Sequence, residues 1–245
     1  MITVNAQAKL TVSLQVTGVR SDGYHEIDAE MVSLELADFV KIDPDGTGLT
    51  FDGPFSAGIP VDDDNLVARA LRLANKSAHV TVTKNIPHGG GLGGGSADAA
   101  AVLAWAEFDD LERASRLGAD IPFCLVGGRA RVRGIGEKIE PLPFTDREFT
   151  LVIPPFGVST PAVYRAWDQL PDSQRHLGVN HLERAACDVE PRLVEWRERI
   201  WRASGIEPVL AGSGATWWLA GSHSALGDEL RDARVIVTKS AYLRR

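Results

Sequence analysis

The chain has 245 residues, 44% of them apolar and 24% charged, which allows one large or two modest domains and argues against disorder. Its formal net charge of −7 argues against a nucleic-acid partner, which usually meets a basic surface, but not against a phosphate site, which needs only local donors. No run approaches the roughly 18 apolar residues of a membrane span, so no membrane partner is expected.

The N-terminal part of the chain is predicted to be rich in strands. Residues 9–16 and 30–36 alternate apolar and polar side chains, and turn residues lie between them. Asn65 follows three aspartates and precedes helical spacing over 66–75, so it suits the N-cap of a helix. Another strand is predicted over 79–83, directly before a run of glycines.

After the glycines, both helices and strands are predicted. An alanine-rich helix is predicted over 96–108, followed by strands over 129–133 and 149–153. Beyond Pro154-Pro155 the sequence predicts helices at 161–169, 180–187 and 191–203, and strands near 209–210, 215–219 and 235–238. This order indicates an α+β protein with two domains, residues 1–153 and 154–245.

The two cysteines and the first residues of the chain indicate the cellular compartment in which the protein is expected. Cys124 and Cys187 lack metal-type spacing, and they are either one disulfide or two reduced thiols. No basic start followed by an apolar core is visible after Met1, so a cytoplasmic protein is expected, as a monomer or a homodimer.

The glycine run between the predicted strand and helix is the most informative segment. Six glycines occupy the seven positions from Gly89 to Gly95, interrupted only by Leu92. Backbone without Cβ atoms can wrap closely around an anion, and the helix behind it adds free amides and the positive end of its dipole. Ser96 suits either the cap of that helix or a hydroxyl contact with a phosphate or Mg²⁺.

Three interpretations of this run compete. A flexible linker rarely lies between a strand and an alanine-rich helix. A dinucleotide fold is formally compatible, because Gly89, Gly91 and Gly94 satisfy G-x-G-x-x-G and Asp109 lies near the position of the acid, although residues 97–108 look like one helix. The third is a kinase phosphate loop without the Walker lysine, whose cation must come from Mg²⁺ or a distant lysine.

The segment Pro87 to Ala97 resembles the phosphate loop of the GHMP kinases. Within that superfamily the chain is similar to the 4-diphosphocytidyl-2-C-methyl-D-erythritol kinase family. The blocks that carry this resemblance occur in family order over most of the chain, namely residues 7–14, 20–26, 117–123, 157–161, 180–183 and 211–215.

The resemblance implies a fold and a reaction. The expected fold has an N-terminal domain like a ribosomal protein and a ferredoxin-like C-terminal domain, with the site between them. The expected reaction is transfer of a phosphoryl group from ATP, with Mg²⁺, to a hydroxyl of a small-molecule substrate that carries cytidine diphosphate, in the non-mevalonate isoprenoid pathway. No residue is predicted as a metal ligand.

Asp120 and Lys9 are the predicted catalytic pair. A hydroxyl needs a base, and a transferred phosphoryl group needs nearby cations. The resemblance implies that Asp120 is the base and that Lys9 orients it and stabilises charge on the phosphate. Without the motif, a turn aspartate and a solvated lysine would be the ordinary interpretations.

The resemblance also implies two binding sets. The predicted nucleotide-binding residues are Asn65, Pro87, Gly89, Gly90, Gly91, Leu92, Gly93, Gly94, Gly95, Ser96 and Ala97. The predicted substrate-binding residues are Thr11, Tyr24, His25, Thr160, Tyr164 and Gly212. Among these, the two tyrosines would stack on cytosine and His25 would read its edge. Each also has a structural alternative, such as packing for a tyrosine or a strand turn for Gly212.

The sequence departs from the family pattern at several positions. Thr11 stands where asparagine is usual, His88 where an apolar residue is common, and Ala97-Asp98 replaces a second serine and its neighbour. Three other functions stay open from the sequence: another GHMP kinase acting on homoserine, a sugar or mevalonate, a non-catalytic nucleotide-binding relative, and a dehydrogenase.

Overall fold

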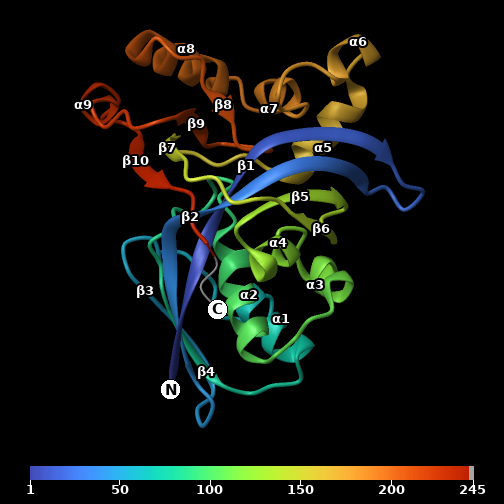
Figure 1. Cartoon of the computed structure of the whole chain (residues 1–245), viewed down its shortest axis with the longest axis vertical. Coiled ribbons are helices and arrows are strands. Elements are labelled where there is room, and N and C mark those ends of the chain that lie inside the picture. The colour runs from blue at the N-terminus through green and yellow to red at the C-terminus, as the bar shows by residue number, and fades with distance from the viewer. Residues whose placement is uncertain (243–245) are drawn as a thin grey trace.

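The computed structural model describes residues 1–242, which form two β-sheets, each packed against helices (Figure 1). The long hairpin of β1 (Ile2–Val19) and β2 (His25–Asp43) runs diagonally through the molecule. Helices α1 to α4 lie on one side of this hairpin, and α5 to α9 gather at the opposite end with the second sheet.

The first sheet has the strand order β3-β4-β2-β5-β6, with β1 paired to β2. Its other strands are β3 (Gly48–Asp52), β4 (His79–Thr83), β5 (Arg129–Gly134) and β6 (Lys138–Pro141). The hairpin strands are longer than predicted. Register shifts near Lys9, Ser13 and Gly18 break the period of two, which hides the full length of the strand in the sequence.

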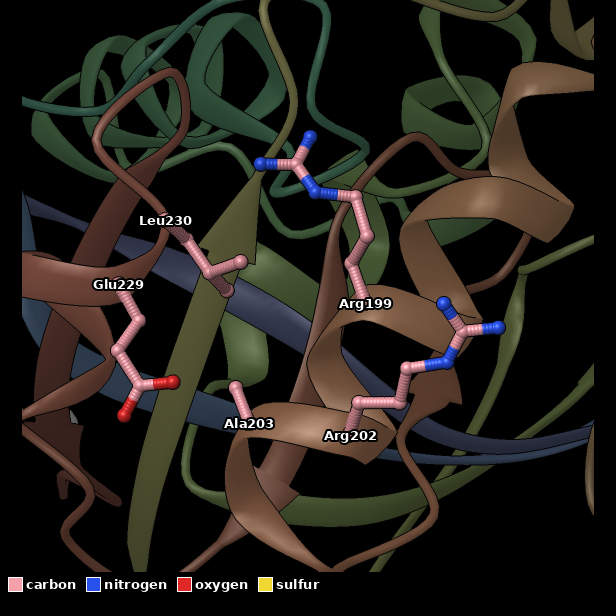
Figure 2. Close-up of a pocket in the computed structure, with 5 residues that line it drawn as sticks. All are labelled: Arg199, Arg202, Ala203, Glu229 and Leu230. Carbon is pink, nitrogen blue, oxygen red and sulfur yellow. The ribbon is translucent and has the colours of Figure 1, made fainter.

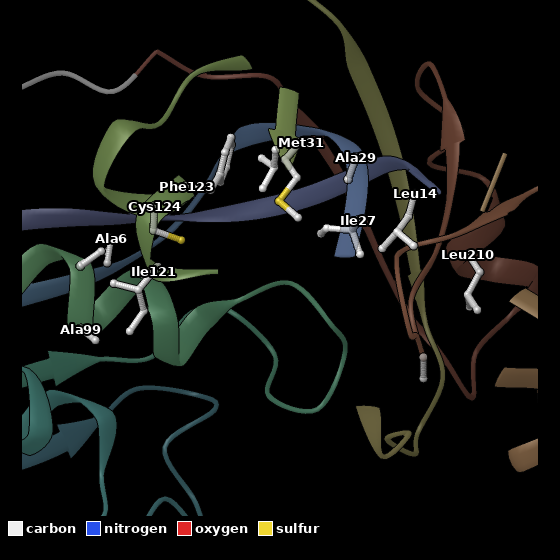
Figure 3. Packing of buried hydrophobic residues seen from close by; sticks show 14 of the residues in the cluster. Ala6, Leu14, Ile27, Ala29, Met31, Ala99, Ile121, Phe123, Cys124 and Leu210 are labelled. Carbon is white, nitrogen blue, oxygen red and sulfur yellow. The ribbon is translucent and has the colours of Figure 1, made fainter. Parts of the chain in front are cut away.

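Four helices form a layer beside this sheet. They are α1 (Leu66–Leu73), α2 (Gly94–Trp105), α3 (Leu111–Leu117) and α4 (Ile121–Val126). In this layer α2 and α4 contact the strands, while α1 packs on α2 and α3 on α4. The alanine-rich α2 packs against β1, β2, α1 and α4, and its small side chains allow this close approach on several sides. Figure 3 shows Ala99 of α2 beside Ile121, near Ala6 of β1 and Cys124 of α4 in this core.

The second sheet is antiparallel throughout, in the order β10-β7-β9-β8. Its strands are β7 (Glu148–Ile153), β8 (Val209–Leu210), β9 (Trp217–Ala220) and β10 (Arg234–Lys239). Its helices are α5 (Thr160–Gln169), α6 (Asp172–Arg175), α7 (Glu183–Val189), α8 (Arg192–Ser204) and α9 (Leu226–Glu229). Because β7 belongs to this sheet, the sheet starts before Pro154; a domain division at 153/154 stays a prediction.

An apolar layer joins the two sheets. Leu10 and Val12 of β1 and Leu34 of β2 pack in one cluster with Phe149 of β7 and Trp218 of β9. The other face of the β1–β2 hairpin contributes to the larger cluster under α2. The hairpin is therefore buried on both faces over its middle, and the two sheets share it as a common support.

The structure confirms the α+β class and the main predicted strands and helices. The sequence prediction omitted β3, α3, α4, β6, α6 and α9, each of seven residues or fewer. Short elements carry too few positions for a period to be visible. Both cysteines are free thiols, so the disulfide alternative is wrong. Across residues 1–242, no helix has the length and apolar character required to cross a membrane.

Candidate functional site

The glycine run forms the N-terminus of α2. Gly93 is the N-cap, with a φ of 70°, and Gly94 and Gly95 already lie in the first turn. Of the two roles considered for Ser96, the helix cap is wrong, because the helix begins two residues earlier and has no side-chain cap, and the phosphate or Mg²⁺ contact stays a prediction. The first-turn amides of a helix have no partner within it, so this end offers donors to an anion.

The glycines are required by close contacts with the second sheet. A Cβ on Gly91, whose φ is 75°, would lie 2.8 Å from the carbonyl oxygen of Gly214. A Cβ on Gly90 would lie 2.8 Å from Oγ1 of Thr216. On the other side, a Cβ on Gly93 would lie 2.8 Å from Cγ of Lys9. The run is thus packed between β1 and the β8–β9 loop, and it is not a flexible linker.

A cavity of about 490 Å³ opens along the run. Its lining includes nine of the eleven predicted nucleotide-binding residues: Asn65, Pro87, Gly89, Gly91, Leu92, Gly93, Gly94, Gly95 and Ser96. Gly90 and Ala97 are outside this lining, since Gly90 faces Thr216 and Ala97 is buried in the core. Asn65 also caps α1, because its Oδ1 accepts a hydrogen bond of 2.9 Å from the amide of Val67.

The two predicted catalytic residues meet beside this cavity, which Asp120 lines. Nζ of Lys9 lies 3.4 Å from Oδ2 of Asp120 and donates to Oγ1 of Thr11 at 3.1 Å. Lys9 is only 6% exposed, and its amide donates to the carbonyl of Leu92 at 3.0 Å. Asp120 lines the cavity immediately before α4. A carboxylate and an ammonium group are therefore held together beside the glycine run.

A second buried lysine lies under the run, and sequence reasoning missed it. Lys84, at the end of β4, donates to Asp38 and, at 2.5 Å, to Oδ2 of Asp98 in α2. Lys84 and Asp98 line the cavity, and Oδ1 of Asp98 has no partner among the described residues. Burial raises the pKa of Asp98 to about 7. The charge of Lys84 acts to lower this pKa, and the nearby carboxylate of Asp38 acts to raise it.

The signal for this cluster was weak in the sequence. Lys84 lies three residues before Pro87, and Asp98 two residues after Ser96, so both flank the glycine run. Asp38, however, lies 46 residues before Lys84, and only the pairing of β2 with β4 brings them together. A buried lysine with two aspartates cannot be read from spacing alone.

The predicted pyrimidine-binding residues are only partly assembled. The ring of His25 lies 4.7 Å from that of Tyr164, between centroids, and Nε2 of His25 lies 2.7 Å from Oδ1 of Asp168. Burial, with a smaller effect of the Asp120 carboxylate, raises the pKa of Tyr164. Tyr24 is 61% exposed in the hairpin turn and has no aromatic partner among residues 1–242.

The remaining substrate-site predictions converge on the β8–β9 loop. A Cβ on Gly212 would lie 3.5 Å from Oγ1 of Thr11, and the hydroxyl groups of Thr160 and Ser213 are 2.7 Å apart. Asn180 was not predicted as a site residue, yet its buried amide donates to the carbonyls of Leu210 and Gly212 at 2.9 and 2.7 Å. Asn180 thereby fixes the loop that faces Lys9 and Thr11.

The donor set near the glycine run suits a divalent cation held mainly by phosphates. The described residues contain no group of three or more histidine, cysteine or acidic side chains that would hold a metal by themselves. Mg²⁺ commonly uses one or two protein oxygens together with water and phosphate. Ser96 and the unpartnered Oδ1 of Asp98 are oxygen donors in the cavity lining, so the site fits Mg²⁺ bound with a nucleotide.

A smaller cavity of about 270 Å³ lies between α8 and α9 (Figure 2). Arg199 and Arg202 approach it from α8, with Glu229 and Leu230 opposite. Both arginines are already paired, Arg199 with Asp232 at 2.6 Å and Arg202 with Glu198 at 2.9 Å. This cavity shares no lining residue with the one at the glycine run and adds nothing to that site.

Comparison with known proteins gives the same picture. Residues 65–128 match the family model described as GHMP kinases N terminal domain. The chain is 40% identical over 229 residues to the 4-diphosphocytidyl-2-C-methyl-D-erythritol kinase of Paracoccus denitrificans, covering 86% of this chain and 84% of the relative. It is 36% identical over 254 residues to the enzyme of that name from Pelotomaculum thermopropionicum, covering 88% of each.

Solved structures extend the similarity to the whole fold. A crystal structure of 4-(cytidine 5'-diphospho)-2C-methyl-D-erythritol kinase superimposes with a TM-score of 0.78 at 31% identity, covering 98% of this chain and 100% of that chain. A homoserine kinase from Cytophaga hutchinsonii matches with a TM-score of 0.61 at 14% identity, covering 98% of this chain and 94% of that chain, which concerns the fold alone.

Proposed function

The chain belongs to the 4-diphosphocytidyl-2-C-methyl-D-erythritol kinase family of the GHMP kinases, and from this premise we propose that it transfers the γ-phosphoryl group of ATP to a hydroxyl of 4-diphosphocytidyl-2-C-methyl-D-erythritol. The observation that carries the proposal is the 3.4 Å pair of Lys9 and Asp120, of which Asp120 lines the cavity along the glycine run. This reaction belongs to the non-mevalonate pathway of isoprenoid synthesis.

Asp120 acts as the base in the proposed reaction. Its carboxylate accepts the proton of the substrate hydroxyl as that oxygen forms a bond to the γ-phosphorus. The bond from the γ-phosphorus to the bridging oxygen breaks, and ADP leaves with the electron pair. Lys9 holds Asp120 in place and offsets negative charge on the transferred group, and its burial strengthens that interaction.

The ATP phosphates bind at the N-terminus of α2 in this proposal. The free amides of the first turn and the Gly93 cap support an anion there. Mg²⁺ would be held by the phosphates with Ser96 and Asp98, and when bound it would neutralise phosphate charge. Asn65, Ile59 and Pro60 line the same cavity as the glycines and support a position for the nucleoside.

The substrate lies on the other side of the catalytic pair. Thr11 and the β8–β9 loop face Lys9, while His25 and Tyr164 provide aromatic and polar contacts for the cytosine ring. Tyr24 would complete the aromatic contacts from the hairpin turn, and Thr160 would bind substrate together with its partner Ser213.

The test is direct turnover. The protein is incubated with ATP, Mg²⁺ and the cytidyl substrate, with ADP release and the phosphorylated product measured together. Homoserine and mevalonate serve as comparison acceptors. We expect product only from the cytidyl substrate. ADP release no higher than in the absence of acceptor would contradict the proposal, and preferred turnover of homoserine or mevalonate would favour another GHMP activity.

A further inference from the structure

A carboxylate behind the cytosine-reading histidine is not accounted for by the proposed reaction. We infer that Asp168 is a positioning residue, which fixes the imidazole of His25 with its hydrogen on Nε2 and so makes Nδ1 an acceptor that selects a pyrimidine carrying an amino group. This inference rests on the proposed function for the identity of the ligand.

Three neighbouring side chains hold the ring of His25 in place. Its Nε2 lies 2.7 Å from Oδ1 of Asp168, while its ring packs against Tyr164 at 4.7 Å and meets Trp167 edge-on at 5.7 Å. The His25 side chain is 9% exposed, so it has little room to rotate. Tyr164, Trp167 and Asp168 all lie on α5, and one helix therefore supplies the two aromatic contacts and the polar contact of this ring.

The C-terminal end of α5 is itself held in place. Indole Nε1 of Trp167 donates a hydrogen bond of 3.1 Å to the carbonyl of Arg175. The guanidinium of Arg175 donates to the carbonyls of Leu170 and Asp168 at 2.8 and 2.5 Å. Arg175 also lies over the Trp167 ring at 5.1 Å. Asp168 thus lies on a braced helix end, which is what orientation of another side chain requires.

The chemistry follows from what each atom can donate. An ionised carboxylate only accepts hydrogen bonds, so the hydrogen of a neutral His25 must lie on Nε2. Its Nδ1, which has no partner among residues 1–242, then carries a lone pair. Cytosine presents an amino donor at the position where uracil presents a carbonyl oxygen. A lone pair on Nδ1 accepts from the first and repels the second.

The first measurement concerns the tautomer and needs no substrate. In protein labelled with ¹⁵N in its histidines, imidazole chemical shifts and one-bond couplings report which nitrogen carries the hydrogen. We expect His25 in the wild-type chain to carry it on Nε2. In Asp168→Asn, whose amide both donates and accepts, we expect a mixture. A wild-type ring with its hydrogen on Nδ1 would overturn the inference.

The second measurement concerns selectivity. Removal of a hydrogen bond to a charged group costs about 1.5–3 kcal/mol, or roughly 10- to 100-fold. In Asp168→Asn and Asp168→Ala we expect KM for the cytidyl substrate to rise by that factor, with kcat and KM for ATP little changed. We also expect the affinity ratio of CDP to UDP to fall by a similar factor. The matched control is Asp109→Asn, an exposed aspartate on the loop before α3, away from α5.

These outcomes separate the inference from the reaction. If the wild type prefers CDP to UDP and the Asp168 variants lose this preference, the inference stands even where turnover is absent. If turnover of the cytidyl substrate is normal but Asp168→Asn retains both its KM and the wild-type ratio, the inference alone is wrong. Thermal unfolding of each variant identifies a loss that comes from misfolding, and Asp168→Asn, which is nearly isosteric, is the variant that decides.

Discussion

At the scale of single residues, replacement of Asp120 tests the mechanism most directly. Asp120→Asn keeps the size of the side chain but cannot accept the substrate proton. We expect kcat to fall by a factor on the order of 10²–10⁴ while the affinity for ATP stays close to wild type. Steady-state rates and nucleotide titration measure the two quantities. Asp109→Asn, on an exposed loop, is the matched control, and full activity of Asp120→Asn would remove Asp120 as the base.

Asp98 gives a prediction of pH dependence. Its pKa is about 7 in the folded chain against 3.8 for an ordinary aspartate, so the folded state keeps a proton that the unfolded chain releases. Its contribution to stability is full below pH 3.8 and is lost as the pH rises towards 7. The slope for one such group reaches about 1.4 kcal/mol per pH unit.

The variant Asp98→Asn removes this titration. We expect the difference in free energy of unfolding, Asp98→Asn minus wild type, to become more positive as the pH rises from about 4 to 7, because only the wild type loses stability, and to level off above 7. Urea unfolding across that range measures the difference, with Asp109→Asn as the control. Parallel curves for Asp98→Asn and wild type would show that Asp98 ionises normally in the buried cluster.

At the scale of elements, the contact between the glycine run and the β8–β9 loop sets the shape of the cavity. In Gly91→Ala the new Cβ meets a backbone carbonyl at 2.8 Å in a residue with a φ of 75°. Gly128→Ala is the matched control, because Gly128 has a φ of 74° but open space around it. The left-handed conformation alone costs about 1–2 kcal/mol, so any further loss in Gly91→Ala measures the clash.

We expect Gly91→Ala to unfold at a lower temperature than Gly128→Ala and to bind ATP more weakly. Thermal unfolding with and without nucleotide gives both results. Equal unfolding temperatures for the two variants would mean that the two loops separate easily, and would argue against a rigid wall on this side of the cavity.

At the scale of the whole molecule, Leu92 connects the nucleotide site to the layer between the sheets. Its side chain is 1% exposed and packs in the cluster that joins β1 and β2 to β7 and β9. Leu92→Ala should lower the free energy of unfolding by about 2–5 kcal/mol. Leu103→Ala is the matched control, since Leu103 is fully buried in the other cluster. We expect only Leu92→Ala to weaken ATP binding as well, as titration calorimetry would reveal.

The sequence predicted the elements whose apolar residues recur with a regular period and the segments that match a motif. The glycine run, Lys9 and Asp120 could be named because the blocks around them occur in family order. The Asp38–Lys84–Asp98 cluster could not, because its members meet only through strand pairing and the packing of α2. The true length of the hairpin was hidden by register shifts, and the start of α2 by glycines that usually end a helix but here begin one.

The anchoring of Leu92 bears on how ADP departs. Because the central side chain of this loop is buried between the two sheets, we expect the loop to keep its position while ADP leaves. The cavity is also lined by Ile59 and Pro60, which lie in the irregular segment between β3 and α1. We expect the opening rate of that segment, rather than movement of the phosphate loop, to limit product release.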